Sequence, residues 1–89
     1  MTFSLQISRQ ASRFLAGQTE QVRIRLWRAI DALREEPCPL GCRKIASLTP
    51  AAWRIRVGDF RVIYEVIEAQ HLIWIQNVVR RNESSYKED

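Results

Sequence analysis

Residues 53–66, WRIRVGDFRVIYEV, alternate large apolar side chains with charged ones on both sides of a Gly-Asp pair. Alternation with period two is typical of a β-strand that buries one face. Gly58 and Asp59, placed between two such runs, indicate a tight hairpin turn. The stretch therefore predicts two antiparallel strands with an apolar face and a second face that is mainly basic. The basic residues on that second face are Arg54, Arg56 and Arg61.

The segment before the hairpin predicts one strand and two helices. Residues 3–7, FSLQI, alternate as a half-buried strand does. Ser8 is a suitable N-cap for a short helix that ends near Gly17, and Thr19 is a suitable N-cap for a longer second helix. Pro37 ends the second helix. The two helices form a hairpin.

After the helices, the chain returns to strands. Residues 43–52, RKIASLTPAA, predict a short extended segment or a turn before the hairpin. Residues 72–79 are apolar on both faces, as in a strand with a neighbour on each side. The expected fold is one α+β domain over residues 1–89, in the order β-α-α-β-β-β. A small, mainly antiparallel sheet has the helical hairpin on one face, and the arginines lie on the other, solvated face.

The charge balance of the chain favours an anionic partner. The chain has 89 residues with fourteen Lys and Arg against ten Asp and Glu, a net charge of +4. Only Lys44 and Lys87 are lysines. Arginine carries a planar fork that matches phosphate and carboxylate groups, so nucleic acid or an acidic protein is the expected partner. The alternative is a solvated surface that happens to be rich in arginine.

The sequence favours a cytoplasmic protein without a metal or cofactor. No apolar stretch approaches the ~20 residues of a membrane span, and residues 1–10 lack the apolar core of a signal peptide. Cys38 and Cys42 lie in a Pro/Gly loop; a disulfide is geometrically possible there, but a reducing compartment predicts two free thiols. His71 is an isolated further candidate for a metal ligand, so no metal site is expected.

Three segments together resemble a known family: RKIASL at 43–48, the hairpin at 53–66, and RRNESSY at 80–86. The chain resembles the RelE side of the RelE/ParE toxin superfamily over its whole length. The resemblance implies a RelE-like fold and a toxin of a type II toxin–antitoxin module. It further implies a ribosome-dependent, metal-free endoribonuclease that cuts mRNA in the A site, held by a RelB-like antitoxin and making no specific DNA contact itself.

The resemblance also implies the site residues. Metal-free RNA cleavage uses the ribose 2′-OH as nucleophile and needs positive charge on the pentacoordinate phosphate. Arginine stays protonated and is a poor proton acceptor, so phosphate binding and charge stabilisation are the roles that transfer. A C-terminal tyrosine would stack on a base. The implied catalytic residues are Arg54, Arg56, Arg61, Arg81 and Tyr86. The expected substrate-binding residues are Arg80 and Lys44.

Other interpretations stay open. The arginines could only solvate the sheet, and Tyr86 could only anchor the tail. A ParE-like protein would inhibit gyrase by binding, without catalysis, and a degenerate member would act only as a binding partner. For the remaining aromatic residues, we expect Trp27 and Trp74 in the core and His71 in a solvated turn.

Overall fold

A computed structural model describes residues 2–39, 41–45 and 52–80, and the expected order of elements is confirmed with two additions. The elements are β1 (Ser4–Ile7), α1 (Arg9–Ala16), α2 (Glu20–Ala32), β2 (Arg43–Ile45), β3 (Ala52–Val57), β4 (Phe60–Ile67), the 3-10 helix η1 (Glu68–Gln70) and β5 (Leu72–Arg80). The additions are η1, in the turn before β5, and β2, which occupies the start of the segment that the sequence left as extended or turn.

Both helices begin at the predicted caps. The Ser8 side chain accepts a hydrogen bond from the backbone N–H of Ala11, and Thr19 accepts one from Val22. The Ser8 hydroxyl also donates to the carbonyl oxygen of Gln76 at 2.6 Å, which ties the start of α1 to β5. One serine therefore caps the helix and fixes it to the sheet.

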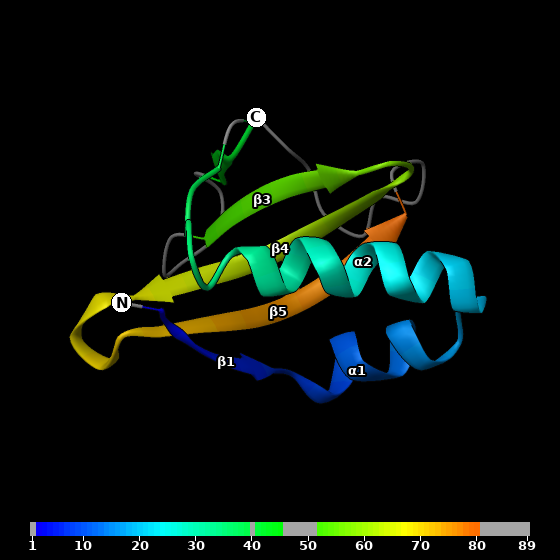
Figure 1. Cartoon of the computed structure of the whole chain (residues 1–89), viewed down its shortest axis with the longest axis horizontal. Coiled ribbons are helices and arrows are strands. Elements are labelled where there is room, and N and C mark those ends of the chain that lie inside the picture. The colour runs from blue at the N-terminus through cyan, green and yellow to red at the C-terminus, as the bar shows by residue number, and fades with distance from the viewer. Residues whose placement is uncertain (1, 40, 46–51, 81–89) are drawn as a thin grey trace.

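The five strands form one sheet in the order β1-β5-β4-β3-β2 (Figure 1). β1 runs parallel to β5, and every other neighbouring pair is antiparallel. The expectation of a mainly antiparallel sheet is confirmed. β5 lies between β1 and β4, as the apolar character of residues 72–79 on both faces predicted.

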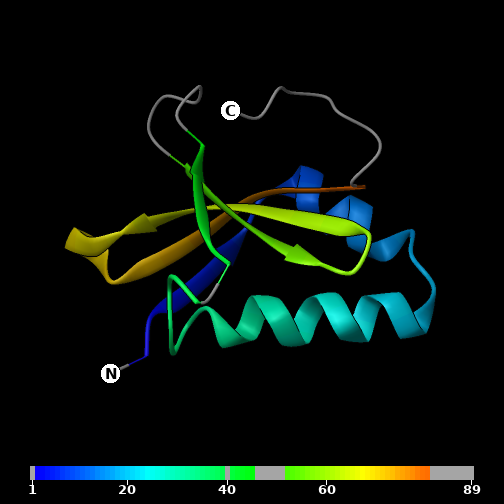
Figure 2. The same cartoon turned by 90° about the horizontal axis from the view of Figure 1, so that it is seen from above.

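The main core lies between the helices and one face of the sheet, and Figure 2 shows α2 running along that face. Its fully buried large side chains include Leu15, Leu26, Ile30, Val62, Tyr64, Ile73 and Ile75. From the hairpin, Phe60 and Tyr64 are buried and Trp53 packs against the core half-buried, so this face of the hairpin is as predicted.

A β-bulge interrupts the pairing of β4 with β5. Ile63 pairs with Asn77, but the next residue, Tyr64, pairs with Ile75, which leaves Gln76 as the extra residue. Because side chains alternate along a strand, one extra residue exchanges the two faces beyond it. Val78 therefore joins the main core, three positions after Ile75.

Three expectations for aromatic residues are wrong. Trp27 is 39% exposed, because it lies on the outer side of α2 instead of in the core. Trp74 is half-buried and pairs with Glu65, on the face away from the helices. His71 is half-buried, with a positive φ of 53° and its ring stacked on Phe3 at a centroid distance of 4.0 Å. It packs on the end of the core instead of being solvated.

None of the helices in the described ranges is long and apolar enough to cross a membrane.

Candidate functional site

A row of arginines crosses β3 and β4 on the face of the sheet away from α2. Arg56 lies directly across from Arg61, and Arg54 lies across from Ile63. The sequence predicted that these three arginines share a face, and the register confirms it. Like charges placed directly opposite each other on neighbouring strands destabilise a sheet. Such a pair is thus an arrangement that folding alone does not favour.

Arg43 extends the row to β2, and the sequence-based interpretation missed it. It pairs with Arg54, so its side chain lies on the same face. The sequence held only a weak signal, since residues 43–45 are two charged residues followed by one apolar residue, and they precede a strand. Assigning β2 as a strand paired with the start of β3 would have placed Arg43 beside Arg54.

The face that carries the arginines is not uniformly solvated, which corrects the expectation of a wet side. Ile45, Ala52 and Ile63 form a second buried cluster there, with Val79 packed against it. Arg54 is only 7% exposed, whereas Arg56 is exposed. Charges beside apolar groups interact more strongly with an anion than fully hydrated charges do, because the effective dielectric is lower.

Both of the predicted substrate-binding residues lie on the other face. Arg80 pairs with Phe60 beyond the bulge, and its guanidinium lies 5.3 Å from the centroid of the Phe60 ring. Lys44 pairs with Trp53 and so points away from Arg43 and Arg54. The structure does not bring these two residues together with the arginine row. Arg81 and Tyr86, the other predicted catalytic residues, lie outside the described residues.

One acidic residue shares the face with the arginines. Glu65 pairs with Trp74, and its carboxylate accepts a hydrogen bond from the side-chain amide of Gln76, the bulge residue. For metal binding, residues 2–39, 41–45 and 52–80 contain no group of three or more His, Cys, Asp or Glu side chains able to hold an ion.

A groove of about 500 Å³ lies along the outer side of β3, next to the short edge strand β2. We call it the edge groove. β2 pairs only with residues 52–54, so in the described part of the chain residues 55–57 of β3 have no strand on the side away from β4. The arginine row reaches this groove from the open face. Its lining residues are Ala29 and Ala32 of α2, Pro39 and Gly41 of the following loop, Arg43, and residues 54–57.

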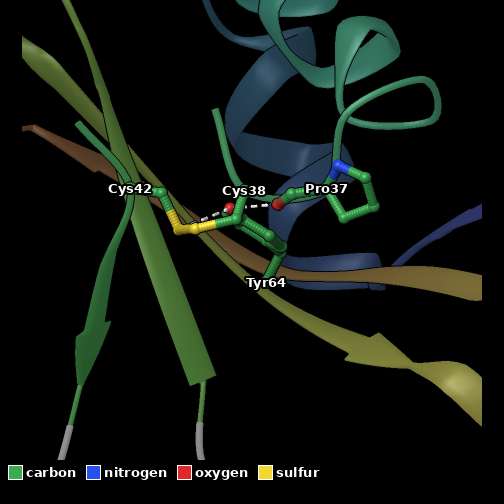
Figure 3. The surroundings of a disulfide bond; sticks show 4 residues. All are labelled: Pro37, Cys38, Cys42 and Tyr64. Carbon is green, nitrogen blue, oxygen red and sulfur yellow. Dashed lines mark hydrogen bonds between the residues drawn. A yellow bond between two sulfur atoms is a disulfide. The ribbon is translucent and has the colours of Figure 1, made fainter. Parts of the chain in front are cut away.

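The loop beside the edge groove is closed by a disulfide between Cys38 and Cys42, which corrects the prediction of two free thiols. The reducing compartment assumed for the thiols was an indirect argument, whereas the turn itself brings the two Cα atoms to 5.3 Å, a distance suited to a disulfide. Figure 3 shows the Tyr64 hydroxyl beside the bond. It donates to the Pro37 carbonyl oxygen at 2.7 Å and lies 3.4 Å from Sγ of Cys42. Burial raises the pKa of Tyr64 above its usual value.

Comparison with known proteins identifies the family. The model of the ParE toxin of the type II toxin–antitoxin system parDE matches residues 5–84. The chain belongs to this toxin family. It therefore falls in the RelE/ParE superfamily, as the hairpin at 53–66 predicted. Among curated proteins, none is similar enough in sequence to count as a relative.

The toxin is similar to solved structures of RelE proteins. It is 27% identical to a chain of the archaeal RelE–RelB complex from Pyrococcus horikoshii, with a TM-score of 0.80, covering 94% of this chain and 100% of that one. A chain of the RelBE2 toxin–antitoxin complex from Mycobacterium tuberculosis is 17% identical, with a TM-score of 0.76 and coverage of 91% and 100%. The isolated RelE toxin of E. coli is 18% identical, with a TM-score of 0.74 and coverage of 93% and 88%. These likenesses confirm the RelE-like α+β fold.

Proposed function

We propose that the toxin is a ribosome-dependent, metal-free endoribonuclease that cleaves mRNA in the A site and so inhibits translation. The observation that carries the proposal is the direct opposition of Arg56 and Arg61 on the open face of the sheet. A bound phosphate between two guanidinium groups turns their mutual repulsion into attraction of an anion.

The arginine row suits the transition state of this cleavage. The 2′-oxygen attacks the adjacent phosphorus while the bond to the 5′-oxygen breaks, which leaves a 2′,3′-cyclic phosphate and a 5′-OH. Negative charge on the non-bridging oxygens is greatest when five oxygens surround the phosphorus. Arg54, Arg56 and Arg61 would stabilise that charge, with Arg81 as a further phosphate contact. Tyr86 would stack on a base next to the cleaved bond.

The support for Arg80 and Lys44 as substrate-binding residues is weaker than for the row, because their side chains lie on the other face. Arg43 is the better candidate for the same role. Its place across from Arg54 extends the positive charge along the path of an RNA backbone.

The expected partners are mRNA, the ribosome and an antitoxin. The similar proteins from Pyrococcus horikoshii and Mycobacterium tuberculosis are toxins in complex with their antitoxins. For this toxin we propose a RelB-like antitoxin that covers the basic face, action in the cytoplasm, and no specific DNA contact by the toxin alone.

The test is a translation reaction with purified toxin, in which primer extension maps cuts in the mRNA. Arg56→Ala and Arg61→Ala should each slow cutting by about 100-fold, as expected when one electrostatic stabiliser of a transition state is removed. Arg9→Ala is the matched control, because Arg9 is an exposed arginine on α1, away from the row. If the row variants cut as fast as the parent, the proposed site is wrong.

A second candidate is a ParE-like toxin that inhibits gyrase by binding alone. The match to the ParE family model favours it. A DNA supercoiling assay with purified gyrase separates the two candidates. Inhibited supercoiling together with intact mRNA in the translation reaction would establish the ParE-like function. Expression without an antitoxin tests the remaining alternative, since a degenerate member would not arrest growth.

A further inference from the structure

The disulfide closes a tight turn at the edge of the arginine row. Cys38 and Cys42 are four positions apart. The backbone N–H of Cys42 donates to the Pro39 carbonyl oxygen at 2.9 Å, and Gly41 adopts a φ of +92°, which residues with a side chain rarely adopt. The turn and the covalent bond together fix Cys42 relative to Cys38.

The turn is anchored to the centre of the sheet through Tyr64. This side chain of β4 is fully buried, and its hydroxyl donates to the carbonyl oxygen of Pro37, directly before Cys38 (Figure 3). Cys42 packs against the main core. The disulfide therefore couples Cys42 to a fixed point of the fold, and through Cys42 it restrains the residue that follows, Arg43.

Arg43 lies on β2, a short strand at the edge of the sheet. The strand has three residues and pairs only with β3 in the described part of the chain. Only Ile45 of the three is buried, at the end far from Cys42. Arg43 is exposed, and together with Pro39 and Gly41 of the turn it forms one wall of the edge groove.

We propose that the Cys38–Cys42 pair is a redox switch on phosphate binding by the arginine row. The disulfide holds Arg43 across from Arg54, so that the edge groove binds the RNA backbone next to the phosphate at Arg56 and Arg61. Reduction frees Cys42, β2 separates from β3, and Arg43 leaves the row. The switch rests on the proposed function and adds to it a dependence on redox state.

The chemistry is thiol–disulfide exchange. Two thiols of a reductant, such as a dithiol or glutathione, give two electrons and two protons to the Cys38–Cys42 bond, which becomes two thiols while the reductant becomes a disulfide. A small oxidised disulfide runs the same exchange in reverse. Cys38 is exposed whereas Cys42 is half-buried, so Cys38 is the expected point of attack.

The experiment measures binding of a fluorescein-labelled ten-nucleotide oligouridylate to the whole toxin by fluorescence anisotropy, at several salt concentrations. The disulfide form is compared with the form reduced by dithiothreitol. Loss of one phosphate contact makes the negative slope of the logarithm of the association constant against the logarithm of the salt concentration shallower by about 0.7 for a single strand. This corresponds to about five-fold weaker binding at 0.1 M salt. We expect this change on reduction.

Variants identify the cause of the change. Arg43→Ala should bind like the reduced form in both redox states, because the contact that reduction removes is already absent. The double variant Cys38→Ser, Cys42→Ser should also bind like the reduced form in both states. Arg9→Ala should keep the full redox dependence. Circular dichroism checks that each variant is folded.

Hydrogen exchange gives a second readout that does not depend on RNA. Reduction should speed exchange of the β2 amides that pair with β3, while the amides of β4 keep their protection. Equal slopes and equal β2 exchange in the two redox states would overturn the switch and leave the proposed function standing. Absence of RNA binding in both states would overturn the phosphate-binding role of the arginine row itself.

Discussion

Arg56 and Arg61 lie directly opposite each other on β3 and β4, on the face of the sheet that the helices leave open. No described residue makes a hydrogen bond or ion pair with the Arg56 side chain. The pair thus combines a cost to folding with a geometry suited to phosphate. Stability and activity should respond in opposite directions when it is changed.

Arg56→Gln should make the free toxin slightly more stable, by about 0.2–0.5 kcal/mol, because it removes repulsion from Arg61. The same change should slow mRNA cleavage by about 100-fold. Urea unfolding measures the stability, and the gain should shrink at 1 M salt, where surface charges are screened. A loss of stability together with full activity would contradict the assignment.

Arg80→Ala should affect stability more than activity. Its guanidinium contacts the face of the Phe60 ring, and such a contact contributes about 0.5–1 kcal/mol. Urea unfolding should show this loss, while mRNA cleavage stays within a few-fold of the parent. In a Phe60→Leu background, where the ring is absent, adding Arg80→Ala should lower the free energy of unfolding only by the side-chain packing that Arg80 loses. A large loss of cleavage in folded Arg80→Ala would return Arg80 to the substrate-binding residues.

Tyr64→Phe should change how stability depends on pH. Because burial raises the pKa of Tyr64 in the folded protein, the unfolded chain ionises first as the pH rises above the ordinary tyrosine value of about 10. The contribution of neutral Tyr64 to the free energy of unfolding is therefore complete below pH ~10 and declines at higher pH. Near pH 11 the free energy of unfolding should have fallen by about 1 kcal/mol.

The measurement is urea unfolding of parent and Tyr64→Phe between pH 8 and pH 11, without reductant. The variant should be less stable at pH 8, because the Pro37 carbonyl oxygen loses its donor, and its stability should decline less above pH 10. Both proteins keep Tyr86, so its titration cancels in the comparison. Parallel pH profiles would contradict this account of Tyr64.

Ser8→Ala should lower stability by about 1–2 kcal/mol. It removes both the cap of α1 and the hydrogen bond to the Gln76 carbonyl oxygen at the bulge. Ser12→Ala is the matched control, since Ser12 is an exposed serine in the interior of the same helix and should tolerate alanine. Thermal unfolding followed by circular dichroism separates the two variants; equal melting temperatures would show that the Ser8 contacts contribute nothing.

The sequence predicted much of the fold, because the decisive signals are local. The caps at Ser8 and Thr19, and the period-two pattern around the Gly58-Asp59 turn, depend on neighbours within a few residues. The same pattern placed Arg54, Arg56 and Arg61 on one face. β2 was missed because three residues carry too short a pattern, and Arg43 was missed with it.

Most of the expectations that were wrong depended on contacts between distant segments. Trp27 follows Leu26, which belongs to the buried apolar face of α2, and only the packing of α2 on the sheet decides that Trp27 faces outward. His71 is half-buried because the turn after β4 brings it onto Phe3, almost seventy residues earlier. The pairing of Cys38 with Cys42 is formed by their own turn, which the distant residue Tyr64 of β4 anchors through the Pro37 carbonyl oxygen.

By itself, the sequence determined that the toxin has a two-helix hairpin, a mainly antiparallel sheet and a basic face on its central hairpin, since spacing within each segment fixes which side chains share a face. Only the tertiary structure decided which arginines belong together across strands. The bulge at Gln76 turns Arg80 to the face of Phe60, and the pairing of β2 with β3 brings Arg43 beside Arg54. The physical reason is that strand register is set by the partner strand, and a shift of one residue exchanges the two faces of the sheet.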